Sequence, residues 1–258
     1  MQNTFDKHTI RLRNTTIGIN PEGGYVSSWR LGETDNVLYQ GQTQKRTGIP
    51  ILFPYFGKAE GKRQHGFGRD SMWTVTDISD TSVSMSLTSE QISEDAKKEY
   101  PYPCIARITV QVLADESLVY TLEVQNTGNA EMPISPGLHP YWALPHSEKT
   151  KIIIEGIEGF DATKIDWENN PPDLVFQYSG KTVVKLPQRE ITIEDITESG
   201  AALKHIVVWS QTSQKDDYNF VCVEPVCGKN EALHENPILV APGKNWEMKI
   251  KFTAKTIS

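Results

Sequence analysis

IARITVQVLADESLVYTLEVQNTG, residues 105–128, contains two runs in which apolar and polar residues alternate, separated by the turn signal LADES. A period of two places every second side chain on the same face of a β-strand. Val, Ile, Thr and Tyr, which fill these runs, also favour strands. Two such runs joined by a short polar turn are typical of an antiparallel hairpin. This segment therefore predicts a long β-hairpin.

The same period of two continues through most of the chain on both sides of the hairpin. It is found in residues 8–19, 71–79, 81–89, 150–157, 182–186, 189–196, 205–211, 219–226 and 245–255. Only residues 93–101, SEDAKKEYP, predict a helical turn, with a serine start signal and a proline stop. We therefore expect an all-β fold: one domain over residues 1–258, a large antiparallel β-sandwich with very few short helices.

Composition and charge restrict the class of protein. The chain has 258 residues, of which 38% are hydrophobic and 23% charged, as is typical of a globular protein. Its formal net charge is −7, and it has no basic run interleaved with aromatic residues. No segment approaches the roughly 20 apolar residues of a membrane span, and residues 1–14 lack the apolar core of a signal peptide. We expect a cytoplasmic monomer or weak dimer that binds neither nucleic acid nor membranes.

The cysteine and histidine spacings predict no metal site. The three cysteines are Cys104, Cys222 and Cys227, and the last two are too far apart for a CxxC pair. No second pair of ligands accompanies them, as a zinc site would require. We expect reduced, mostly buried thiols in a reducing compartment, with no metal and no cofactor.

Three segments interrupt the strand pattern: residues 46–73, 133–145 and 220–228. Each combines Gly, Pro and aromatic residues with one or two ionisable side chains. On a β-sandwich, such segments are expected at strand ends or in loops, where functional residues concentrate. They are therefore the candidates for a functional site.

His139 and Glu224 are the candidate acid–base pair. His139 lies in PGLHPYW, where a core histidine bonded to a carbonyl would give the same pattern. Glu224 follows an apolar run and is in phase with Phe220 and Cys222. Burial there would raise its pKa toward the value that a general base needs. A carboxylate at a strand end that faces water is the alternative, and the local sequence leaves both possibilities open.

A cluster of basic residues lies within one short window of this net-acidic chain. Its members are Lys45, Arg46, Lys58, Lys62, Arg63 and Arg69. An arginine can bind sugar hydroxyls, a phosphate or a carboxylate, and the glycines beside His65 allow the backbone to approach a ligand. The cluster is consistent with an anionic substrate group. The alternatives are an Arg69–Asp70 pair and a solvated basic face.

Five segments together resemble the aldose 1-epimerase (galactose mutarotase-like) family, most closely its hexose-6-phosphate 1-epimerase branch. The segments occur in the family's order: Gly23-Gly24 with Trp29, RTGIPILFPYFG (46–57), QHGFGR (64–69) with Trp73, GLHPY (137–141) and VEP (223–225). The resemblance implies a mutarotase-like supersandwich with the sugar site on a concave sheet face. It also implies an isomerase that interconverts the α and β anomers of an aldohexose or a hexose 6-phosphate.

The resemblance also implies roles for individual residues. His139 matches the general acid and Glu224 the general base. Four more residues match ligands of the substrate: Arg46, His65, Arg69 and Asp173. Apart from the resemblance, the position of Trp142 beside His139 suggests that it stacks on a sugar face, and a place in the core is the alternative. Two departures concern the substrate rather than the reaction: Thr47 and Val226 stand where the phosphosugar branch often has Gly and Trp.

Anomer exchange explains why an acid and a base are needed. A base takes the proton of the anomeric hydroxyl while an acid protonates the ring oxygen. The ring opens, the C1 end rotates, and the ring closes with the roles reversed. A histidine and a carboxylate suit these tasks near neutral pH. A non-catalytic sugar-binding or sugar-sensing protein on the same fold is the alternative, and a lyase or hydrolase is a third.

Overall fold

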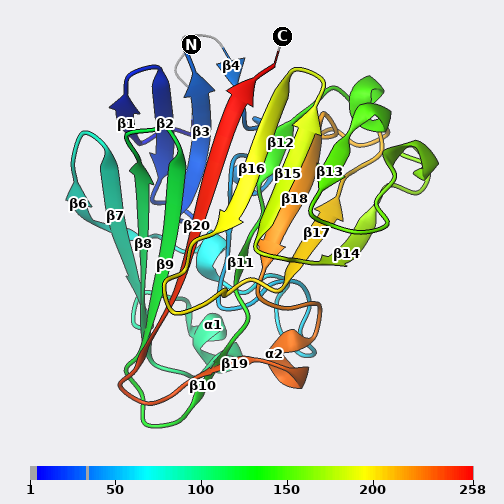
Figure 1. Ribbon diagram of the computed structural model, residues 1–258. Coiled ribbons are helices and arrows are strands. Elements are labelled where there is room, and N and C mark those ends of the chain that lie inside the picture. Colours follow the sequence, from blue (N-terminus) through cyan, green and yellow to red (C-terminus); the bar gives the residue numbers. More distant parts are fainter. Residues whose placement is uncertain (1–4, 33–34, 258) are drawn as a thin grey trace.

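The computed structural model describes residues 5–32 and 35–257 of the chain, and two antiparallel sheets dominate it (Figure 1). In spatial order the larger sheet consists of β13 (Ile153–Glu155), β15 (Lys181–Leu186), β16 (Arg189–Asp195), β20 (Asn245–Thr256), β9 (Leu118–Asn126), β8 (Cys104–Val112), β7 (Ser82–Thr88) and β6 (Thr74–Ile78). The second sheet consists of β14 (Asp173–Gln177), β17 (His205–Trp209), β18 (Phe220–Val226), β11 (Gly137–Leu138) and β5 (Ile51–Leu52), with β12 (Tyr141–Ala143) also paired to β18.

Smaller elements complete the fold. One small sheet contains β1 (His8–Leu12), β2 (Thr15–Asn20), β3 (Tyr25–Leu31) and β4 (Asp35–Asn36), and another contains β10 (Met132–Ile134) and β19 (Ile238–Val240). The α-helices are α1 (Glu94–Glu99) and α2 (Ala232–Glu235), and the 3-10 turns are η1 (Gln44–Arg46), η2 (Gly68–Asp70), η3 (His146–Lys151) and η4 (Ala162–Lys164). No helix of the described residues is both long and apolar enough to cross a membrane.

The two large sheets share one hydrophobic core, as expected for stacked layers. Val208 and Val223 of the second sheet belong to the same buried cluster as Ile193 of the larger sheet. Trp142 of β12 contacts Phe252 of β20, with ring centroids 5.9 Å apart. The predicted all-β sandwich is thus confirmed.

The hairpin that the sequence predicted is the centre of the larger sheet. β8 and β9 pair continuously from Cys104↔Asn126 to Val112↔Leu118. The helical turn is also present: the Ser93 hydroxyl caps α1 by accepting a hydrogen bond from the Ala96 N–H at 3.2 Å.

Two strand predictions need correction. Residues 8–19 form a hairpin of two strands rather than one strand, because the chain turns at Arg13, whose φ is +51°. Residues 150–157 begin within the 3-10 turn η3, so only the three residues of β13 form a paired strand.

Candidate active site

The outer face of β18, opposite the shared core, carries the candidate base. Val221 and Val223 point into the core. Cys222 and Val226 lie in apolar clusters on the other face, and Glu224 falls between them by alternation. The phase predicted from the sequence is confirmed.

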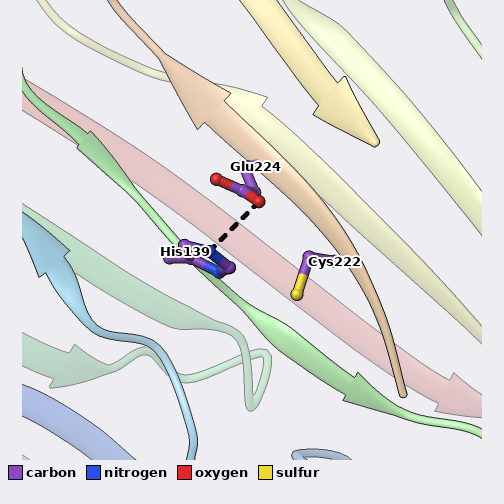
Figure 2. A group of neighbouring side chains, drawn as sticks. All are labelled: His139, Cys222 and Glu224. Atoms are coloured by element: carbon purple, nitrogen blue, oxygen red, sulfur yellow. Dashed lines mark ion pairs between the residues drawn. The ribbon is translucent and has the colours of Figure 1, made fainter. Parts of the chain in front are cut away.

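His139 lies directly across from Glu224 in neighbouring strands. β12 pairs with β18 at Tyr141↔Cys222, and β11 pairs with it at Gly137↔Val226. His139 is midway between these pairs, as Glu224 is on the facing strand, so one register brings the two side chains to the same face. His139 Nε2 and Glu224 Oε1 are 3.3 Å apart (Figure 2).

A break in the strand ladder gives both side chains room. Pro140 separates β11 from β12, and Pro225 lies in β18. Proline has no N–H, so it cannot donate to a ladder. The His139 N–H instead donates to the Pro50 carbonyl at 3.0 Å, which fixes the backbone next to the gap.

Burial sets the protonation of the pair. Glu224 is 1% exposed and His139 6% exposed. Burial, followed by the charge of Asp173, raises the pKa of Glu224 well above its ordinary value. Burial, followed by the charges of His65, Arg69 and Arg46, lowers the pKa of His139. Both shifts favour the uncharged forms, a protonated Glu224 and an unprotonated His139. Glu224 Oε2 and His139 Nδ1 have no hydrogen-bond partner among the described residues.

His65 is held as a neutral hydrogen-bond donor beside this pair. Its Nδ1 accepts from the Gly57 N–H at 2.9 Å, so the ring proton resides on Nε2. Burial, and then Arg69, lowers its pKa to about 3. Its ring centroid lies 5.7 Å from that of His139. The neighbouring Gly66, at φ +67°, allows close approach to the Phe53 carbonyl, which an added Cβ would meet at 2.2 Å.

Six of the seven predicted site residues line one cavity of about 340 Å³: Arg46, His65, Arg69, His139, Asp173 and Glu224. They come from segments far apart in the sequence, since Asp173 begins β14 and Arg46 ends η1. The cavity wall also includes Lys45 and Lys58. Cationic groups therefore outnumber the two carboxylates around it.

The prediction for Trp142 is wrong. Its side chain is fully buried in the core against Phe252, because alternation along β12 turns it away from the cavity. Tyr141 and Trp209 line the cavity instead. Tyr141 stacks on the His139 ring at 4.6 Å and 8°, and Trp209 meets that ring edge-on at 5.6 Å. Tyr141 could have been found from its phase with His139, whereas Trp209 lacked any local signal.

The basic cluster divides into cavity residues and structural pairs. Lys45 pairs with Asp70 at 2.7 Å, so the alternative Arg69–Asp70 pair is not what holds this loop. Arg63 pairs with Glu99 at 2.9 Å. Arg46 lies over the Trp209 ring at 5.0 Å, in cation–π contact.

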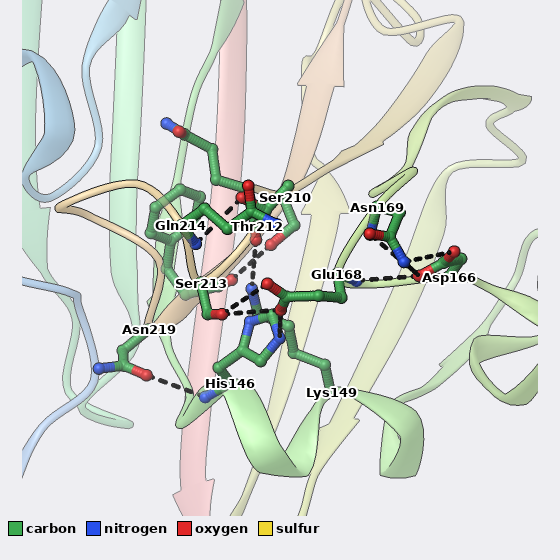
Figure 3. Close-up of polar contacts among 12 residues, drawn as sticks. His146, Lys149, Asp166, Glu168, Asn169, Ser210, Thr212, Ser213, Gln214 and Asn219 are labelled. Carbon is green, nitrogen blue, oxygen red and sulfur yellow. Dashed lines mark hydrogen bonds and ion pairs between the residues drawn. The ribbon is translucent and has the colours of Figure 1, made fainter.

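A polar network fixes the loop that follows β17 (Figure 3). The buried Lys149 donates from Nζ to the Gln211 carbonyl at 2.9 Å. The side-chain amide of Gln211 lies against the Arg46 guanidinium. Glu168 accepts from the Ser213 hydroxyl and lies 3.2 Å from His146 Nε2. This network connects η3, residues 166–169 and the loop after β17.

One group of described residues also has the donor atoms to hold a metal. A ring nitrogen of His139, the sulfur of Cys222 and a carboxylate oxygen of Glu224 all lie within 4.8 Å of one another. The sequence spacings did not reveal this group, because strand pairing rather than chain proximity brings it together.

Known proteins resemble this chain in sequence and in fold. A protein from Cenchrus ciliaris, named as a candidate glucose-6-phosphate 1-epimerase, is 26% identical over 289 aligned positions, which cover 97% of this chain and 85% of the relative. The crystal structure of the Slr1438 protein from Synechocystis sp. PCC 6803 matches with a TM-score of 0.80 at 22% identity, covering 100% of this chain and 99% of the other. Galactose 1-epimerase from Lactobacillus acidophilus NCFM matches with a TM-score of 0.73 at 12% identity, over 97% and 94%. The family model described as Aldose 1-epimerase matches residues 7–253, and the chain therefore belongs to the aldose 1-epimerase family.

Proposed function

We propose that this protein interconverts the anomers of a hexose 6-phosphate, with His139 as general acid and Glu224 as general base. The observation that carries this proposal is the 3.3 Å contact between His139 Nε2 and Glu224 Oε1 at a cavity lined by Arg46 and Arg69. The relatives from Cenchrus ciliaris and Salmonella typhimurium that are named as candidate glucose-6-phosphate 1-epimerases support the phosphosugar.

The spacing of the pair suits the reaction. The anomeric hydroxyl oxygen and the ring oxygen are bonded to the same carbon, so the groups that serve them must lie close together. Glu224 takes the hydroxyl proton while His139 protonates the ring oxygen, and the bond between C1 and the ring oxygen breaks. After the C1 end has rotated, the ring closes again. Glu224 then returns its proton to the oxygen on C1, and His139 takes a proton back from the ring oxygen. Burial favours the uncharged pair, so the reactive form, an ionised Glu224 beside a protonated His139, arises by transfer of one proton from Glu224 to His139 across their 3.3 Å contact.

The rest of the cavity would hold the sugar. The Nε2–H of His65 can donate to a hydroxyl, and the Asp173 carboxylate can accept from one. Tyr141 and Trp209 offer flat apolar surface. The guanidinium groups of Arg46 and Arg69 can bind phosphate with paired hydrogen bonds. The cavity of about 340 Å³ falls at the lower end of small-molecule sites.

The acid–base assignment is tested with Glu224→Gln and His139→Asn. Each is expected to lower kcat for anomer exchange by ~10²–10⁴-fold, because each removes one proton-transfer group. Mutarotation followed by NMR or polarimetry gives the rate. Glu235→Gln and His234→Asn, which lie outside this cavity, are the matched controls. Rates near wild type in both site variants would refute the assignment, and saturable sugar binding without acceleration would favour a sugar-sensing protein.

The phosphate assignment is tested with Arg46→Gln and Arg69→Gln. Both are expected to raise KM for glucose 6-phosphate far more than for glucose, and added salt should raise it as well. Arg63→Gln is the control, since Arg63 is paired with Glu99 away from the cavity. If glucose and glucose 6-phosphate are used equally well by the wild type at every ionic strength, the substrate is not a phosphosugar.

We further propose a cytoplasmic location and a monomer or weak dimer. The three cysteines are free and buried, as in proteins of reducing compartments. Sedimentation at two protein concentrations would measure the oligomeric state.

A further inference from the structure

We infer that His139, Cys222 and Glu224 form a latent zinc site whose occupation blocks the sugar site. The potential ligand atoms of these three buried residues lie within 4.8 Å of one another. Figure 2 shows the three side chains gathered between β18 and the segment that joins β11 to β12. Zinc favours such a mixture of imidazole, thiolate and carboxylate ligands.

The geometry of the acid–base pair matches two zinc ligands. Zinc binds imidazole nitrogen and carboxylate oxygen at about 2.0–2.2 Å with tetrahedral angles, which places two such ligand atoms roughly 3.3–3.5 Å apart. His139 Nε2 and Glu224 Oε1 are 3.3 Å apart. Glu224 Oε2 is buried and has no hydrogen-bond partner in residues 5–32 and 35–257, so a second carboxylate oxygen is also available.

Cys222, on the same strand as Glu224, supplies the third ligand. It lies two residues before Glu224 on β18, which turns both side chains to the same face. Tyr141 is its direct cross-strand partner, and His139, two residues before Tyr141, contacts Glu224 at 3.3 Å, so the sulfur and the imidazole lie on one face. On binding, zinc replaces the thiol proton, which leaves to water.

The fourth position of a tetrahedral zinc ion would be open to the cavity that His139 and Glu224 line. A bound ion would remove both proton-transfer groups and occupy the place of the anomeric carbon. Zinc is therefore expected to compete with the sugar. Arg46 and Arg69 repel a dication, so the affinity should fall below that of a four-ligand structural site.

Binding is measured with Co²⁺ and Zn²⁺ on the full chain. Co²⁺ should give the near-ultraviolet charge-transfer absorption of a thiolate ligand, and Zn²⁺ should remove it by displacement. The absorption is expected to vanish in Cys222→Ala and to persist in Cys104→Ala and Cys227→Ala, whose thiols are buried elsewhere. Excess sugar phosphate should weaken it. The thiolate absorption itself and its loss in Cys222→Ala do not depend on the proposed activity.

Inhibition is measured separately, since it does rest on the proposed function. Each variant's anomer exchange in added Zn²⁺ is divided by its own zinc-free rate, and a chelator should restore the rate. Loss of a direct ligand should raise the inhibitory Zn²⁺ concentration by roughly tenfold or more in Cys222→Ala. Absence of the thiolate band in the folded wild type, or a band or zinc sensitivity unchanged in Cys222→Ala, would overturn the site.

Discussion

Glu224, the proposed general base, lowers the free energy of unfolding when it is ionised in its buried position. It lies in a strand whose seven residues are all buried, with Cys222 and Val226 as its neighbours on the same face. A carboxylate placed there resists ionisation, since burial penalises the charged form. The same penalty makes it a better base once it is ionised. In the proposed mechanism, one side chain therefore links stability to catalysis.

Stability should depend on pH through Glu224. Its pKa is raised above the ordinary 4.5, so the folded state binds the proton more tightly than the unfolded chain. The stabilisation from this group is complete below the unfolded pKa and is lost as pH rises through the folded pKa. The free energy of unfolding of wild type should therefore fall relative to that of Glu224→Gln as pH rises. Urea titrations of both proteins across this range measure it, and parallel pH curves would contradict the raised pKa.

At the scale of elements, strand register positions His139 opposite Glu224. The pairs that place His139 opposite Glu224 belong to ladders of one and three residues, on either side of a gap. The longer β17–β18 ladder, with five pairs, fixes β18 along its other edge. The loop after β17 adds a second anchor, because Lys149 holds Gln211 next to Arg46.

Lys149→Met should separate positioning from chemistry. Burial lowers the pKa of Lys149 to about 8, and its ammonium also lies 5.8 Å from the ring centroids of Trp167 and Phe220. Methionine fills similar space but cannot donate to the Gln211 carbonyl. We expect a higher KM for glucose 6-phosphate with kcat little changed, because Gln211 is then no longer held against the Arg46 guanidinium. Steady-state kinetics test this. An equal change for unphosphorylated glucose would show that the loop does not act through Arg46.

Which elements could be predicted follows from how they are buried. β8 and β9 alternate clearly, since each has one face in the core. β3 was missed because its first five residues are all buried, including Ser27 and Ser28, and no alternation marks it. β5, β11 and β12 have two or three residues each, too few to show a period. The candidate pair His139 and Glu224 was visible as polar residues in apolar contexts. The strands that carry Trp209 and Cys222 were also predicted, but the pairing that brings them next to His139 was not.

For the molecule as a whole, the core and the cavity lie on opposite faces of the second sheet. Trp142 and Trp209 illustrate this division. Trp142 is 0% exposed and packs against Phe252 across the sandwich, whereas Trp209 lines the cavity. A tryptophan's contribution is thus decided by the face on which alternation places it.

Replacing Trp142 by alanine should mainly lower stability, whereas replacing Trp209 by alanine should mainly raise KM. Trp142→Ala is expected to lower the free energy of unfolding by about 3–5 kcal/mol, as for other large core side chains, while folded enzyme keeps its KM. Trp209→Ala should cost less stability and raise KM. Chemical denaturation and kinetics of both variants measure the difference. A KM effect confined to Trp142→Ala would restore that residue to the sugar site.

The position of the acid–base pair in paired strands has a consequence for how this enzyme can change. The groups that contact the proposed phosphate, Arg46 and Arg69, come from the connecting segment 46–73. The same segment also holds β5, which pairs with β11, and Pro50, whose carbonyl accepts the hydrogen bond of the His139 N–H. Changing the side chains at positions 46 and 69 alone, with β5 and Pro50 kept, is therefore the route that would redirect the proposed catalyst to another carbohydrate while its proton-transfer pair stays in place.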